Sequence, residues 1–101
     1  MNHSPTIWEL QSHAKRLLQE DRLGDIAILV ENACQSGGYR ILILTLNNLL
    51  EFCSDPSQAR QISHFLDEYV TVSPFFTRLL RVKEEAMYAR LGDVGKLKTL
   101  F

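Results

Sequence analysis

Three side chains that could hold a metal ion lie within one helical turn of each other. His64, Asp67 and Glu68 stand at i, i+3 and i+4, so on a helix they share one face. A structural or catalytic metal site needs further ligands fixed by a second element, and the sequence offers none at a suitable spacing. A solvated helix face explains the three residues more simply, so we expect no metal here.

The other reactive groups also indicate structure rather than catalysis. Cys34 and Cys53 each border an apolar segment without a neighbouring base, which is typical of small buried hydrophobic residues. The segment Gln35-Ser36-Gly37-Gly38 lacks the following lysine and hydroxyl residue of a phosphate-binding loop. The sequence therefore predicts a protein that is not an enzyme and that uses no cofactor.

The composition suits one small domain covering residues 1–101. Hydrophobic residues make up 46% of the chain, which is ample for a core, and the formal net charge of −1 gives no global attraction to nucleic acid or membranes. No apolar run is long enough to span a bilayer. The first nine residues lack the pattern of a signal peptide, and two cysteines make no disulfide scaffold, so we expect a cytoplasmic protein.

Prolines and glycines mark where helices should begin and end. Each proline follows a good N-cap residue, in the pairs Ser4-Pro5, Asp55-Pro56 and Ser73-Pro74. Gln58 is placed to complete a capping box with Asp55. Left-handed C-caps are expected at the glycines that follow apolar segments, which are Gly24, Gly37, Gly38 and Gly92.

Between these marks the apolar residues recur at helical spacing. In the segment that begins at Pro74, the predicted apolar face consists of Phe75, Leu79, Val82 and Ala86, with Phe76 and Leu80 alongside. The segment 39–53 is apolar around most of its circumference, which indicates a central helix. A buried strand over 39–46 is the alternative, but the chain offers no second strand to pair with it.

The predicted fold class is all-α, with six helices in three antiparallel hairpins over about 5–36, 39–71 and 74–101. The connections are short, which forces sequence neighbours to lie antiparallel. The hairpins either stack into an α-solenoid or close into a compact helical bundle.

A repeat is visible in the turns. Leu23-Gly24-Asp25 recurs as Leu91-Gly92-Asp93 after 68 positions, which is twice the period of about 34 residues in tetratricopeptide repeats. The stretch 87–101 resembles the interhelix turn of tetratricopeptide and pentatricopeptide repeats, with Tyr88 and Phe101 at the positions of packed aromatic residues. It departs from the tetratricopeptide pattern at Glu85 and Leu97, where small residues are preferred.

In size, hairpin count and turn pattern, the chain also resembles the small tetratricopeptide-like chaperones of type III secretion needle subunits. That resemblance implies stacked hairpins which cradle an amphipathic helix of a subunit prone to polymerise. It rests on these general features, because the sequence contains no motif diagnostic of that class.

We therefore expect a non-catalytic protein-binding module, such as a small chaperone or adaptor. A concave face between the first helices of successive hairpins would accept an amphipathic helix of another protein, or a second copy of the chain. The predicted contact residues, which are apolar anchors with two arginines at the rim, are Trp8, Tyr39, Arg78, Arg81, Tyr88, Leu100 and Phe101.

The distribution of charge leaves an alternative function open. From residue 77 onward six basic residues face three acidic ones, a net charge of +3, whereas residues 1–76 carry five basic and nine acidic residues, a net charge of −4. A small helical nucleic-acid-binding regulator could use this basic C-terminal segment. Apart from Tyr88, however, the segment lacks interleaved aromatic residues for base stacking, so we consider nucleic acid the less favoured partner.

Overall fold

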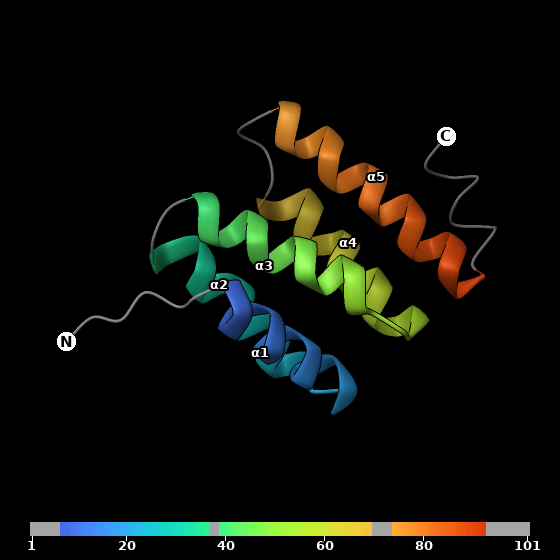
Figure 1. Cartoon of the computed structure of the whole chain (residues 1–101), viewed down its shortest axis with the longest axis horizontal. Coiled ribbons are helices and arrows are strands. Elements are labelled where there is room, and N and C mark those ends of the chain that lie inside the picture. The colour runs from blue at the N-terminus through green and yellow to red at the C-terminus, as the bar shows by residue number, and fades with distance from the viewer. Residues whose placement is uncertain (1–6, 37–38, 70–73, 93–101) are drawn as a thin grey trace.

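The computed structural model describes residues 7–36, 39–69 and 74–92, and these form five α-helices joined by short connections (Figure 1). The helices are α1 (Ile7–Gln19), α2 (Leu23–Ser36), α3 (Tyr39–Phe52), α4 (Pro56–Tyr69) and α5 (Pro74–Leu91). The described residues contain no strand, which confirms the all-α prediction. The sixth predicted helix, over 93–101, lies outside the described residues.

Helix α3 occupies the centre of the molecule. It contacts each of the other four helices, and Leu46, Leu49 and Leu50 are almost completely buried. The strand alternative for 39–46 is therefore wrong, because this segment is helical along its whole length. Because α3 is apolar around most of its circumference, the sequence predicted a central helix, and neighbouring helices cover it on several sides.

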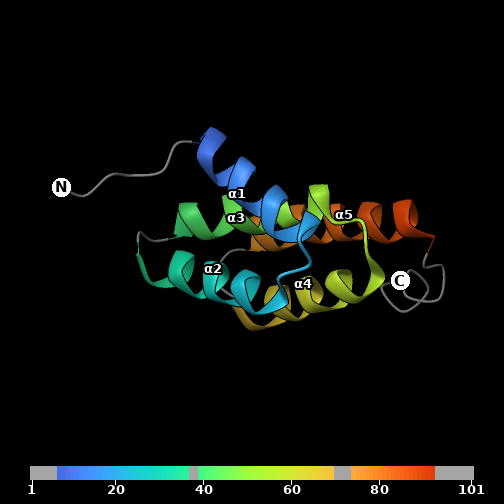
Figure 2. The same ribbon diagram turned by 90° about the horizontal axis from the view of Figure 1, so that it is seen from below.

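The helices form two layers, which Figure 2 shows edge-on. Helices α1, α3 and α5 lie side by side in one layer, and α2 and α4 form the other. Helices α3 and α5 run parallel, since Tyr39 packs against Phe76 at one end while Arg90 donates to the Cys53 carbonyl at the other. Each of these two contacts joins residues 37 positions apart, so the two helices keep one register along their length.

The predicted start of α4 is confirmed, but the predicted capping box is wrong. Asp55 Oδ1 accepts hydrogen bonds from the backbone N–H groups of Ser57 (2.8 Å) and Gln58 (3.3 Å). The Gln58 side chain instead crosses to the end of α1, where Nε2 donates to the Leu18 carbonyl (2.9 Å) and to Asp21 Oδ1 (2.7 Å). The last carbonyls of a helix have no partner within it, so this bond ties α1 to α4.

The left-handed residues differ in part from those predicted. Gly92 follows α5 with φ of 76°, as predicted. Gly24 lies in the first turn of α2, so its predicted role as a C-cap is wrong. The left-handed conformation after α1 belongs to Asp21 (φ 54°), a residue type that adopts it more readily than most. Gly37 and Gly38 are outside the described residues.

Candidate protein-interaction face

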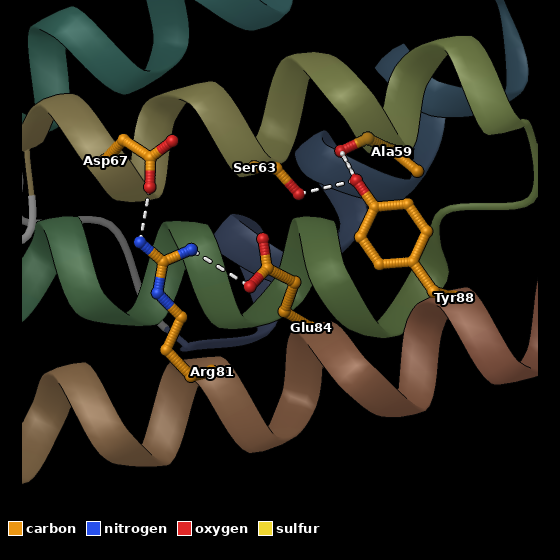
Figure 3. A network of polar contacts seen from close by, with 6 residues as sticks. All are labelled: Ala59, Ser63, Asp67, Arg81, Glu84 and Tyr88. Atoms are coloured by element: carbon orange, nitrogen blue, oxygen red, sulfur yellow. Dashed lines mark hydrogen bonds and ion pairs between the residues drawn. The ribbon is translucent and has the colours of Figure 1, made fainter. Parts of the chain in front are cut away.

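One side of α5 faces α4 and is joined to it by polar side chains (Figure 3). The Tyr88 hydroxyl lies 2.6 Å from Ser63 Oγ and donates to the Ala59 carbonyl at 3.2 Å. Both the Tyr88 ring and its hydroxyl are completely buried. Two hydrogen bonds to α4 therefore fix the position of this tyrosine and, with it, the C-terminal half of α5.

An ion-pair chain lies two turns away on the same side of α5. Arg81 Nη1 donates to Glu84 Oε1 at 2.9 Å, and Nη2 donates to Asp67 Oδ1 on α4 (Figure 3). Partial burial lowers the pKa of Arg81, but the hydrogen bonds to Asp67 and Glu84 raise it by more, so the net pKa lies above its ordinary value. Glu84 is only 1% exposed, and its charge depends on Arg81 for compensation.

These contacts correct two predicted interaction residues. Tyr88 is part of the core and cannot contact a partner in this fold, because its polar group is satisfied by α4. Arg81 is engaged within the molecule, since both of its terminal nitrogens bind carboxylates, and this role is not the predicted one at a partner-binding rim. Both residues hold α4 and α5 together.

The opposite side of α5 carries apolar residues that nothing among the described residues covers. Phe75 is 70% exposed, Leu79 43% and Val82 58%, and Ala86 is also exposed. Their spacing of i, i+4, i+7 and i+11 places them on one helical stripe, called here the α5 stripe. The sequence predicted these four residues as the apolar face of the segment, whereas the face that the fold buries contains Leu80 and Met87.

The α5 stripe adjoins α3. Phe76 and Arg90 contact α3, whereas Arg81 and Tyr88 contact α4. With 100° of rotation per residue, the α5 stripe lies next to the α3-facing residues around the helix axis. It points away from α4. It therefore lies on the outer face of the layer formed by α1, α3 and α5.

A groove of about 510 Å³ runs between α3 and α5 beside this stripe. Its lining is mainly apolar and consists of Tyr39, Arg40, Ile43, Leu44 and Phe76. The ring centroids of Tyr39 and Phe76 are 5.6 Å apart in an edge arrangement, and those of Phe75 and Phe76 are 5.3 Å apart. The stripe and the groove together form one apolar surface with an aromatic end.

The remaining predicted contact residues fall into two groups. Tyr39 lines the groove, Arg78 is exposed three positions after Phe75, and Trp8 is 74% exposed on α1 in the same layer. The N-terminal ends of α1, α3 and α5 lie toward one end of the molecule (Figure 1). Leu100 and Phe101 lie outside the described residues.

The histidine, carboxylate and cysteine side chains that could do chemistry either bind other side chains or lie apart from one another. His64 Nε2 lies 3.3 Å from Glu68 Oε2, Asp67 binds Arg81, and no group of three metal ligands occurs in the ranges 7–36, 39–69 and 74–92. Burial raises the pKa of the Cys53 thiol, which lies 3.3 Å from the Asp55 carbonyl. Cys34 is exposed, contrary to its predicted burial. These side chains make no arrangement of nucleophile and base.

Comparison of the chain with protein-family models, with curated proteins and with solved structures gave no match. Within the five described helices, none combines the length and the apolar character needed to cross a membrane.

Proposed function

We propose that this protein is a non-catalytic protein-binding module, a small chaperone or adaptor of the cytoplasm. It takes an amphipathic helix of another protein on the outer face of the layer formed by α1, α3 and α5. The observation that carries this proposal is the α5 stripe, where Phe75, Leu79 and Val82 are exposed together beside an apolar groove. Single exposed apolar residues are ordinary, whereas a contiguous group on one face marks an interaction site.

The arrangement of the helices supports the same proposal. Helices α1, α3 and α5 are the first helices of the three predicted hairpins, and they share one layer while α2 and α4 share the other. This alternation is what a tetratricopeptide-like stack of hairpins produces. In such a stack, the first helices together offer a continuous surface that can accept a helix with apolar residues at i, i+3, i+4 and i+7.

Affinity purification from the native host, followed by quantitative mass spectrometry, tests this function. The wild-type chain is compared with Leu79→Ser and with the matched control Ile28→Ser, which alters an exposed apolar residue on α2 in the other layer. We expect one protein to be retained by the wild type and the control and to be lost from Leu79→Ser. Equal retention by all three chains would contradict the proposal.

A second variant measures the affinity for the protein so recovered. Trp8→Ala is expected to weaken binding by about 2 kcal/mol, roughly 30-fold in Kd, because exposed tryptophans are frequent anchors of interfaces. Circular dichroism and thermal unfolding check that the variant keeps its fold. An unchanged Kd would show that α1 is not part of the binding face.

A further inference from the structure

Two cations, one lining the groove between α3 and α5 and one further along α5, have no partner among the described residues. Arg40 lines the groove and is exposed, and Lys83 is half-buried on α5. Neither side chain makes an ion pair or a hydrogen bond with any residue of the described ranges. Two positive charges beside an apolar surface are therefore available to a ligand.

The register of α3 and α5 places Lys83 along this groove. Lys83 lies seven positions after Phe76, two helical turns on the same face, and Phe76 lines the groove. Because contacts between the two helices join residues 37 to 40 positions apart, Lys83 is level with the part of α3 around Leu44. Arg40 is correspondingly level with Leu79 in the α5 stripe.

The carboxylates of these two helices lie away from the groove, either on another side of the helix or further along it. Glu84 is buried and binds Arg81 on the side that faces α4. Glu85 is two positions after Lys83, about 200° around the helix, and so lies on a different side. Glu51 shares the face of Leu44 but lies two turns further along α3, in its last turn and away from Tyr39. The apolar groove thus has a positive border.

We propose that the groove selects a partner helix which carries acidic residues next to its apolar stripe. Apolar side chains of that helix pack against Leu44, Phe76 and Leu79, and its carboxylates pair with Arg40 and Lys83. Charge complementarity of this kind contributes to specificity and to the association rate. This inference rests on the proposed function and names the class of partner for the same face.

Charge also argues against another occupant, the chain's own residues 93–101. That segment contains Lys96 and Lys98 against one acidic side chain, Asp93, so its lysines would bring like charges to Arg40 and Lys83. A helix with acidic residues beside its apolar stripe brings opposite charges to Arg40 and Lys83. The positive border therefore favours a different protein over this segment.

Three synthetic peptides of 18 residues test the proposal directly. All share one leucine stripe at i, i+3, i+4 and i+7, and the positions beside the stripe are glutamate, glutamine or lysine. Binding to the full-length chain is measured by fluorescence anisotropy at low and high salt. We expect the glutamate peptide to bind about ten-fold more tightly than the glutamine peptide at low salt, and the lysine peptide to bind most weakly. Salt should reduce these differences.

Variants of the chain assign the preference to named residues. Arg40→Gln and Lys83→Gln should each weaken binding of the glutamate peptide several-fold and leave the glutamine peptide unaffected. The matched control is Arg16→Gln, on the side of α1 that faces α2. It should leave the affinities for both peptides unchanged. A preference for glutamate that survives both groove substitutions would overturn the inference.

The outcomes separate this inference from the proposed function. If the glutamate and lysine peptides bind equally and Leu79→Ser abolishes both, the face binds helices but does not select acidic ones, and only the inference fails. If none of the peptides binds, both fail. Displacement of the glutamate peptide by a single-stranded RNA, or by vesicles of anionic lipid, would assign the two cations to a different ligand and would also overturn the inference.

Discussion

The two sides of α5 reverse the usual relation between polarity and burial. The side that faces α4 buries a carboxylate, Glu84, together with the hydroxyl of Tyr88. The outer side leaves Phe75 and Val82 mostly exposed. Both belong to one continuous helix (Figures 1 and 3).

The difference between the two sides shows what each one is for. Buried polar groups are tolerated where partners satisfy them, and Arg81, Ser63 and Ala59 provide those partners. The contacts that cross to α4, from Tyr88 to Ser63 and Ala59 and from Arg81 to Asp67, specify how α5 sits on α4. The outer side has no such partner among the described residues, so its apolar groups contribute little to folding and are available for binding.

The largest effect on stability is expected from Arg81→Met. This change leaves the buried carboxylate of Glu84 without a counter-charge, and the free energy of unfolding should fall by about 3 kcal/mol, since breaking a buried pair is strongly destabilising. Chemical denaturation at neutral pH measures the loss. The double variant Arg81→Met, Glu84→Met should recover most of it, because no uncompensated charge remains. A double variant as unstable as Arg81→Met alone would contradict this account.

A smaller loss is expected from Tyr88→Phe. Removal of the hydroxyl leaves the Ala59 carbonyl and Ser63 Oγ without their buried partner, which should cost about 1.5 kcal/mol in the free energy of unfolding. Tyr39→Phe is the matched control. The Tyr39 hydroxyl is buried without a hydrogen-bond partner among the described residues, so its removal should change stability by less than about 0.5 kcal/mol. Equal losses in the two variants would show that the contacts to α4 are not what holds α5.

The smallest effect on stability is expected on the outer side. Val82→Ser replaces an exposed apolar residue and should shift the free energy of unfolding by less than about 0.5 kcal/mol, whereas Leu80→Ala in the core should lower it by about 3 kcal/mol. Thermal and urea unfolding of the two variants provide the comparison. If Val82→Ser unfolds as easily as Leu80→Ala, then the α5 stripe belongs to a core, and the binding face is wrongly assigned.

Much of the fold could be predicted because its signals are local. The apolar circumference of the 39–53 segment predicted a central helix, and the Asp55-Pro56 pair predicted the start of α4. Such features depend on residues within one or two turns of each other. The prediction that Gly24 caps the preceding helix was wrong, because Asp21 takes the left-handed conformation three residues earlier. The sequence alone does not show which of the two residues takes that conformation.

The two sides of α5 could not be told apart from the sequence. The helix carries two apolar stripes, of which the one that begins at Phe75 is uninterrupted and the one that contains Leu80 and Met87 is interrupted by Glu84. Which stripe is buried depends on how α5 packs against other helices, through contacts such as those of Tyr88 with Ser63 and Ala59, and these leave no pattern in the sequence. The contacts of Arg81 and of Tyr88 with α4 removed both residues from the predicted interaction residues, and the α5 stripe takes their place.

A chemical-shift map tests the central claim most directly. The full-length chain, labelled with ¹⁵N, is titrated with the glutamate-flanked peptide, and the backbone amide shifts are followed residue by residue. We expect the largest changes along α5 near Leu79 and along α3 near Leu44, with α2 and α4 unchanged on their outer surfaces. Changes centred on Ile28 of α2, or on the outer surface of α4, would place the binding site in the other layer and contradict the account.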